Sequence, residues 1–177
     1  DVCSSDLNGK WKISFIKKST TAGAISVCTS GTGTKAQLHA FYADLPTKDL
    51  RYALFSNNKW SFATIDGDGE SVQDYREEIR RKTAADVSVS NACAVTTSGL
   101  QVFYRDETQG ILLGASKTET GWVYEIVDGD AKKGGRTTGD VAYHLSAAAL
   151  GKTIYLIYDS VRSEEHTSEL QSQSTIS

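Results

Sequence analysis

The chain has 177 residues, of which 39% are hydrophobic and 23% are charged, and its formal net charge is -3. This composition is typical of a globular protein, and it excludes a disordered chain, a fibrous chain and a strongly basic nucleic-acid-binding domain. The length fits one domain or a piece of one, and no apolar run is long enough to cross a bilayer.

Both ends of the chain match the translation of one synthetic oligonucleotide. Residues 162–172 read as a common sequencing-library adapter, and residues 1–7 read as the reverse complement of the start of that adapter. We therefore interpret residues 1–7 and 162–177 as adapter-derived and leave them out of the fold prediction, as for a cloning scar. We expect them to pack poorly, with few long-range contacts. Residues 8–161 are then predicted to be an internal fragment of a longer protein.

The interior of the chain repeats with a spacing of 62 residues. Four pairs of positions keep this spacing: Leu38 and Leu100, Ala53 and Ala115, Trp60 and Trp122, and Asp66 and Asp128. One spacing held over four markers indicates a structural repeat. Trp11 stands in a similar context but precedes Trp60 by only 49 residues, so the longer repeat is expected to carry a 13-residue insertion.

Each repeat unit is predicted to form four short strands separated by turn residues. The expected strands are 24–29, 36–43, 50–56 and 59–66 in the first unit, and 88–96, 100–106, 111–117 and 121–128 in the second. The first strand of a unit is rich in small residues, and the second is apolar on both faces. The fourth alternates in the way expected of a half-exposed outer strand.

Four antiparallel strands in a repeat of this length are typical of one blade of a β-propeller. The chain is therefore predicted to be all-β and to contain part of a propeller, with blades at about 19–67 and 83–129 and half a blade at about 138–160. A β-sandwich, which shows similar strand spacing, is the alternative. Residues 71–82 have a Ser cap and helix formers, so they are predicted to form a short helix between blades.

A partial propeller has a consequence for its surface. Two blades and a half cannot close a ring, so we expect an open arc. The terminal faces of that arc, which further blades would cover, should expose apolar side chains. The half blade should also leave an unpaired strand edge.

The repeat units resemble lectin-like β-propeller repeats of bacterial and fungal proteins, and among named groups they are most similar to fungal fucose-specific lectins. The resemblance covers most of residues 8–161 and rests on Tyr-x-Asp, Leu-Arg-x-Ala, Trp-x-Phe and Asp-Gly-Asp motifs. It implies a non-catalytic carbohydrate-binding module of a secreted or cell-surface protein. The sugar pocket of those lectins uses an arginine on the second strand and a glutamate on the third. Those strands offer His39 or Gln101 and residues 51–53 or 113–115 here, so fucose is not implied.

Aromatic and basic residues of the repeat are the predicted sugar contacts, because an aromatic ring offers a flat apolar face to a sugar. They are Tyr42, Arg51, Tyr52, Trp60, Tyr104, Arg105 and Trp122. The alternative for Trp11, Trp60 and Trp122 is packing between blades, which their recurrence in the repeat favours.

The segment after the first Asp-Gly-Asp motif resembles a calcium loop, because it supplies carboxylates at suitable positions. The candidate ligands are Asp66, Asp68, Glu70, Asp74 and Glu77. Ser71 occupies the position where the sharp turn needs glycine, and the second copy at 128–131 lacks the later acids. An Asp-Gly turn at the end of the outer strand is therefore the favoured interpretation, and no cofactor is predicted.

The cysteines and histidines of residues 8–161 carry no recognisable catalytic or metal-binding motif. Cys28 and Cys93 lie on predicted inner strands of adjacent blades and are interpreted as small buried residues. A disulfide between them requires those strands to approach closely. His39 and His144 are not in equivalent repeat positions, and they are expected to be structural or surface residues.

Three function classes stay open at this point. The first is the carbohydrate-binding module, and the second is a propeller scaffold for protein partners, with Tyr75 and the loop at 70–82 as the contact. The third is a propeller glycosidase, which needs paired acids facing a central channel. The predicted inner strands carry no acid, although further blades of the parent protein could supply them. Expected partners are thus a glycan or a protein, together with the remaining blades, and not a nucleic acid.

Overall fold

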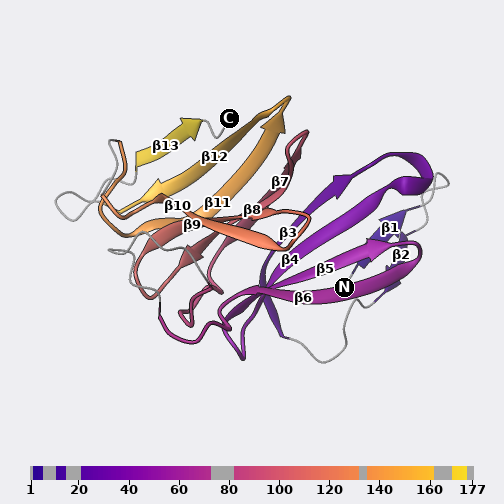
Figure 1. Cartoon of the computed structure of the whole chain (residues 1–177), viewed down its shortest axis with the longest axis horizontal. Coiled ribbons are helices and arrows are strands. Elements are labelled where there is room, and N and C mark those ends of the chain that lie inside the picture. The colour runs from indigo at the N-terminus through magenta and orange to yellow at the C-terminus, as the bar shows by residue number, and fades with distance from the viewer. Residues whose placement is uncertain are drawn as a thin grey trace.

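The fold is known from a computed structural model, which describes residues 2–5, 11–14, 21–72, 82–131, 135–161 and 169–174. Within these residues the chain is all-β, and its only helical segment is a short 3-10 helix, η1 (Gly33–Lys35). The strands form a hairpin and three larger antiparallel sheets that lie in a row (Figure 1). The predicted helix over 71–82 falls mainly on residues 73–81, outside the described residues.

The first sheet is an up-and-down meander in which strands pair in chain order. Its strands are β3 (Ala22–Ser30), β4 (Gln37–Asp44), β5 (Asp49–Ser56) and β6 (Lys59–Asp66). The turn between β5 and β6 has positive φ at both Asn57 and Asn58, as two-residue hairpin loops that match the strand twist require. Asparagine tolerates this conformation, which explains why the hairpin could be predicted from the sequence.

The second sheet is a meander of the same design. It contains β7 (Asn91–Thr96), β8 (Gly99–Asp106), β9 (Ile111–Lys117) and β10 (Trp122–Asp128), again paired in chain order. The second strands β4 and β8 are buried along nearly their whole length, whereas β6 is largely exposed. The eight predicted strands are therefore all present, and the β-strand assignment is confirmed.

The 62-residue repeat is also a repeat of strand register. Trp60 pairs with Phe55 at the start of β6, and Trp122 pairs with Lys117 at the same point of β10. Tyr42 and Tyr104 likewise occupy equivalent places in β4 and β8. Even the irregularity at the end of the outer strand recurs, because the register shifts just before Asp66 and just before Asp128. The predicted structural repeat is confirmed.

The third sheet contains β11 (Val141–Leu150), β12 (Thr153–Ser160) and β13 (Glu169–Ser174). β1 (Val2–Ser5) pairs with β2 (Trp11–Ser14) in a separate hairpin. The expectation of few long-range contacts in the terminal segments is wrong for β13, which pairs with β12 along its six residues. The edge of β12, expected to be unpaired, is therefore covered. That the terminal segments are adapter-derived stays a prediction.

The three sheets are stacked so that their first strands are neighbours: β3 lies beside β7, and β7 lies beside β11. The later strands diverge from this line, so the sheets fan out in Figure 1. The described sheets form an open series and do not close into a ring. We call the face of each sheet that points toward the C-terminal end of this series its forward face, and the face that points toward the N-terminal end its rear face.

The apolar core lies between sheets rather than within one. One cluster joins the forward face of the first sheet, including Phe41 and Tyr52, to the rear face of the second, including Val102 and Leu113. A second cluster, which includes Phe103, joins the second sheet to the third. Burying one such side chain contributes about 1.5–3 kcal/mol, so the contacts between neighbouring sheets stabilise both partners.

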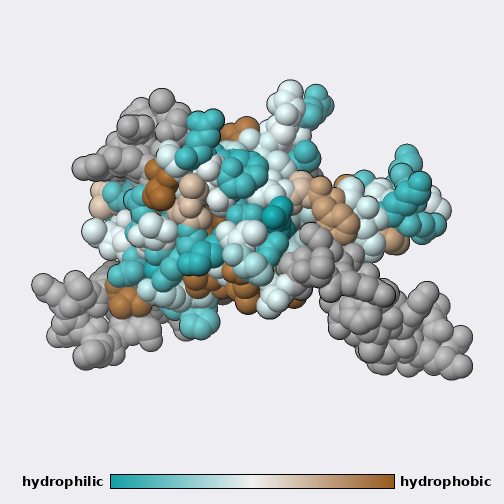
Figure 2. Space-filling view, turned by 90° about the horizontal axis from the view of Figure 1, so that it is seen from below, coloured by the Kyte–Doolittle hydropathy of each residue, from teal (hydrophilic) through white to brown (hydrophobic). Residues whose placement is uncertain are grey.

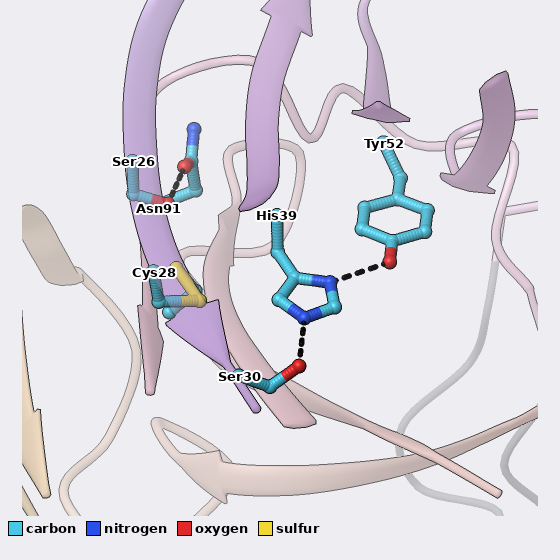
Figure 3. The surroundings of a disulfide bond; sticks show 7 residues. Ser26, Cys28, Ser30, His39, Tyr52 and Asn91 are labelled. Atoms are coloured by element: carbon cyan, nitrogen blue, oxygen red, sulfur yellow. Dashed lines mark hydrogen bonds between the residues drawn. A yellow bond between two sulfur atoms is a disulfide. The ribbon is translucent and has the colours of Figure 1, made fainter. Parts of the chain in front are cut away.

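A disulfide joins the first two sheets at their inner strands. Cys28 on β3 and Cys93 on β7 are bonded, with their Cα atoms 6.1 Å apart. The favoured interpretation of these cysteines as unlinked buried residues is therefore wrong, because the neighbouring inner strands do approach closely enough. Beside the disulfide, the Ser26 hydroxyl donates to Asn91 Oδ1 over 2.6 Å (Figure 3). Asn91 Nδ2 donates in turn to the Ala24 carbonyl over 2.8 Å.

A second link between sheets recurs at the end of each complete sheet. The Tyr104 hydroxyl of the second sheet donates to Asp66 Oδ2 of the first over 2.6 Å. The Tyr158 hydroxyl of the third sheet donates to Asp128 Oδ2 of the second over 2.8 Å. Both aspartates are buried, at 1% and 0% exposure, so the bonds lie inside the sheet-to-sheet interfaces. We call these two contacts the Asp–Tyr bonds.

The same aspartates also hold the linker between sheets. Asp66 Oδ1 accepts the Gly67 and Thr83 backbone N–H groups over 2.9 and 2.7 Å. Asp128 Oδ1 accepts the Gly129 and Thr137 N–H groups over 2.8 and 2.6 Å. Gly67 is required there, because its φ is +100° and a Cβ atom would lie 2.7 Å from the Asp49 Cα atom.

Removal of the disulfide is the first test of this arrangement. Replacing Cys28 and Cys93 together by Ser should lower the free energy of unfolding by about 2–4 kcal/mol, because the closed loop is long. Urea denaturation of the double variant and of the parent chain measures the difference. Cys3→Ser, outside this disulfide, serves as the control and should leave stability and the 28–93 cross-link unchanged. A cross-link between other cysteines, found by peptide mapping, would contradict the assignment.

Tyr104→Phe tests the Asp–Tyr bond. Burial raises the pKa of Asp66 from 3.8 to about 6, and its hydrogen bonds oppose that rise. Asp66 thus contributes stability that is present below pH 3.8 and is lost as the pH rises through about 6. Loss of the Tyr104 donor should raise this pKa further and cost about 1–3 kcal/mol when Asp66 is ionised.

The expected destabilisation by Tyr104→Phe is therefore larger at neutral pH than near pH 5, where Asp66 is largely protonated. Urea denaturation at both pH values measures it. Tyr155→Phe is the matched control, because Tyr155 is 44% exposed, and it should change neither value. Equal effects of Tyr104→Phe at the two pH values would show that Asp66 does not titrate as proposed.

Candidate functional site: a polar row on the first sheet

A row of polar side chains runs across the forward face of the first sheet. His39 on β4 lies between Ser30 and Tyr52, with its Nε2 atom 2.7 Å from the Ser30 hydroxyl and its Nδ1 atom 2.7 Å from the Tyr52 hydroxyl. The planes of the His39 and Tyr52 rings are nearly parallel, with an interplanar angle of 9° and centroids 6.0 Å apart. Figure 3 shows His39 between the two hydroxyl groups, next to the disulfide.

The row continues away from Tyr52 through an amide. The Ser30 hydroxyl is 3.4 Å from Gln37 Oε1, and Gln37 Nε2 donates to the Ser56 hydroxyl over 3.2 Å. The five residues Ser30, Gln37, His39, Tyr52 and Ser56 are called the polar row. They come from three adjacent strands, and the pairing of β3 with β4 and of β4 with β5 places all five on the same face. Ser30, Gln37 and Ser56 are half-buried, while His39 and Tyr52 are buried.

An aromatic side chain of the second sheet stands opposite one end of this row. Trp122, the first residue of β10, contacts Tyr52 edge to face, with ring centroids 5.6 Å apart at 77°. It also meets Phe41 at 5.9 Å and 84°. The Lys117 ammonium lies 5.5 Å from the Trp122 ring, close enough for a cation–π interaction, and both residues retain solvent exposure. The row therefore ends against a ring with a cation beside it.

Burial sets the electrostatics of the polar row. It lowers the pKa of His39 from 6.5, so the neutral imidazole is favoured. It raises the pKa of the Tyr52 hydroxyl to about 12, so this group stays protonated. The row is thus an uncharged set of hydroxyl, amide and imidazole groups, each able both to donate and to accept. Such a set can hydrogen-bond polyhydroxyl ligands but holds no strong nucleophile or acid.

The second sheet does not reproduce the polar row. Gln101 occupies the repeat position of His39, and its buried Oε1 atom has no hydrogen-bond partner within the described part of the chain. Gly114 occupies the position of Tyr52, and Glu125 and Val127 from β10 lie where its side chain would be. The chemistry of the first interface is therefore peculiar to it, although both interfaces share one backbone plan.

The structure divides the seven predicted sugar contacts among three places. Tyr42, Arg51 and Trp60 lie on the rear face of the first sheet. Arg51 is bound there by Thr64, by Asp44 with an Nε to Oδ2 distance of 3.4 Å, and by Asp49 over 3.1 Å. Tyr42 is 8% exposed, and Trp60 packs beside Phe55. Only Tyr52 and Trp122 are brought into contact with each other across the first interface.

The remaining two predicted contacts are buried between sheets. Tyr104 is 0% exposed and forms an Asp–Tyr bond. Arg105 is 1% exposed, donates to Glu107, to the Val141 carbonyl and to Asp140, and lies 3.7 Å from the Tyr143 ring. Arg105 therefore joins the second sheet to the third, and its guanidinium faces protein groups instead of solvent. For Trp122, the packing interpretation agrees with its contacts across the interface.

The candidate calcium ligands have other partners where they are described. Asp66 accepts hydrogen bonds from Tyr104, Gly67 and Thr83, and Asp68 forms an ion pair with Lys82 at 2.8 Å. Glu70 is exposed, and Asp74 and Glu77 lie outside the described residues. No group of three or more potential metal ligands gathers in the described part of the chain. The Asp-Gly turn interpretation accounts for Asp66 and Gly67.

Sequence reasoning missed four members of the polar row. Ser30, Gln37 and Ser56 are common polar residues near strand ends, and His39 was interpreted as a structural or surface histidine. A usable signal existed, since His39 stands inside an otherwise apolar second strand, and a buried polar group needs partners. The pairing of β3, β4 and β5 then identifies which residues those partners are.

The polar row predicts a pH effect of its own. Since the folded-state pKa of His39 lies below 6.5, the unfolded chain takes up a proton first as the pH falls. The contribution of neutral His39 to the free energy of unfolding is present above pH 6.5 and is lost as the pH falls through the folded-state pKa of His39. His39→Gln keeps a donor and an acceptor without titrating, so it should lose less stability than the parent chain between neutral pH and about pH 5. NMR titration of the His39 ring checks the cause, and a pKa at or above 6.5 would contradict it.

No protein-family model, curated protein or solved structure matches the chain. Among the described residues, no helix has the length and apolar character needed to cross a membrane.

Proposed function

We propose that this chain is part of a β-propeller and that it is a non-catalytic carbohydrate-binding module. The propeller assignment is supported by two complete four-stranded meanders with one register, by their stacking through the first strands, and by the Asp–Tyr bonds that recur between sheets. Stacking of three sheets in series favours a propeller over a sandwich, in which two sheets face each other.

The observation that supports carbohydrate binding is the polar row beside Trp122. Sugar hydroxyl groups need partners that both donate and accept, and hydroxyl, amide and imidazole groups do so. A sugar ring also has an apolar face that packs on an aromatic ring. Tyr52 and Trp122 are the predicted contacts that retain a role in this site, and Ser30, Gln37, Ser56 and Lys117 join them. Fucose is not specified, because no arginine and glutamate pair stands in the row.

A protein-interaction scaffold is the second candidate, although the loop expected to carry it includes residues 73–81 and Tyr75, outside the described residues. A glycosidase is less well supported, because β3, β7 and β11 contain no Asp or Glu. The disulfide between Cys28 and Cys93 supports a protein of an oxidising compartment, in agreement with a secreted or cell-surface lectin.

A glycan array probed with the full chain tests the proposal, and binding above background to at least one glycan class is expected. Gln37→Ala and Ser56→Ala should then each raise the dissociation constant about tenfold, equivalent to about 1.4 kcal/mol, because each removes a hydrogen-bonding group from the row. Lys152→Ala, in the exposed turn between β11 and β12, is the matched control and should bind as the parent chain does.

Two results would overturn the proposal. One is a correctly folded chain, with its disulfide formed, that binds no glycan above background. The other is glycan binding that Gln37→Ala and Ser56→Ala leave unchanged, which would place the site elsewhere.

A further inference from the structure

The next sheet covers the middle of the forward face of each of the first two sheets, while Ser30, Gln37 and Ser56 of the polar row stay half-buried. Phe41 on β4 is 0% exposed, and Phe103 at the same place on β8 is 1% exposed. On the inner strands, Cys28 of the first sheet is bonded to the second sheet, and Ala94 of the second sheet is buried against the third. A forward face of this repeat is therefore built to be covered.

The forward face of the third sheet is exposed. Ile157 on β12 stands where Phe41 and Phe103 stand in the other sheets, directly before the tyrosine of the Asp–Tyr bond, and it is 49% exposed. Tyr155 lies on the same face of β12 as Ile157 and is 44% exposed. Leu150 of β11 also lies on this face, because it pairs with Thr153, and it is 71% exposed. Alternate residues of β12 that face the second sheet, such as Leu156, are buried. The exposure is thus specific to one face.

The rear face of the first sheet is exposed at positions that are covered in the other sheets. Ile25 on β3 pairs with Tyr42 as Asn91 pairs with Tyr104, yet Ile25 is 59% exposed and Asn91 is 7% exposed. Val27 and Phe62 on the same face are 55% and 48% exposed, while Ala53 in the middle of the face is buried. In Figure 2, hydrophobic residues reach the surface in separate patches toward both sides of the molecule.

The internal repeat indicates that the exposed forward face of the third sheet and the exposed rear face of the first sheet fit each other. Rear faces of this repeat pack on forward faces twice within the chain, at the first and second interfaces. The sequence at the two ends is complementary as well. The third sheet has three strands where the first two sheets have four, and β2 begins with Trp11, in a context like that of Trp60 and Trp122 at the start of fourth strands.

We propose that this chain associates with a second copy of itself head to tail, with the forward face of the third sheet of one copy on the rear face of the first sheet of the other. The interface would repeat the packing of the two internal ones, with Ile157 and Tyr155 of one copy against Ile25 and Val27 of its partner. Such a contact is heterologous, so it leaves one free face at each end and allows further copies to add until a ring closes. This association does not depend on glycan binding.

The test uses the full chain and three lysine variants, each at an exposed aliphatic position. Ile157→Lys disables the forward face, and Val27→Lys disables the rear face. Val123→Lys is the matched control, because Val123 is 58% exposed but lies on β10, the outermost strand of the middle sheet. Circular dichroism and thermal denaturation verify that all three variants fold. Light scattering coupled to size-exclusion chromatography gives the mass at a series of concentrations.

The mass of the parent chain and of Val123→Lys is expected to rise with concentration, while Ile157→Lys and Val27→Lys each remain monomeric. An equimolar mixture of Ile157→Lys and Val27→Lys should form a one-to-one dimer that does not grow, since each variant retains the face that the other lacks. A parent chain that stays monomeric overturns the proposal. So does a Val27→Lys or Ile157→Lys variant that associates as well as the parent chain, because two like faces would then be in contact.

Discussion

The hydrogen bond from a tyrosine of one sheet to a buried aspartate of the previous sheet is the constraint on which the rest of the structure depends. Within the described residues no sheet has a closed core of its own, because the two large apolar clusters each lie between two sheets. The Asp66–Tyr104 and Asp128–Tyr158 bonds set how one sheet sits on the next. A buried carboxylate without its donors would be costly, so the register of the interface is held to one solution. Stability is then a sum of contacts between neighbouring sheets.

Local signals made the strands, their order and their register predictable from the sequence. Turn residues such as Asn57 and Asn58 mark hairpins, and the spacing of 62 residues transfers the register of one sheet to the next, including the irregularity before Asp66 and Asp128. The packing of Trp122 between sheets followed from the same recurrence. These features depend on residues close in the sequence or equivalent in the repeat, so a single chain contains enough information to predict them.

Contacts that differ between the repeats were not predictable in the same way. The disulfide follows only from the close approach of β3 to β7. The repeat gives no hint of it, because Ala94 stands at the position equivalent to Cys28 and Val27 at the position equivalent to Cys93. Arg105 was a plausible ligand contact by residue type, yet the third sheet buries it completely. The polar row joins residues from three strands, and its partners are fixed only when all three are paired. The candidate site thus depends on tertiary contacts that the repeat pattern does not encode.

The linkers between sheets are closed at their two ends by hydrogen bonds to one buried aspartate each. Asp66 binds Gly67 and Thr83, which is 17 residues beyond it, and Asp128 binds Gly129 and Thr137, which is nine residues beyond it. A basic residue before each threonine repeats the closure, since Lys82 and Arg136 each contact a backbone carbonyl and an aspartate. Because lengthening a closed loop costs little, this junction tolerates insertions of different length. The first linker is therefore a natural position for grafting a foreign peptide or a small domain without disturbing the sheets.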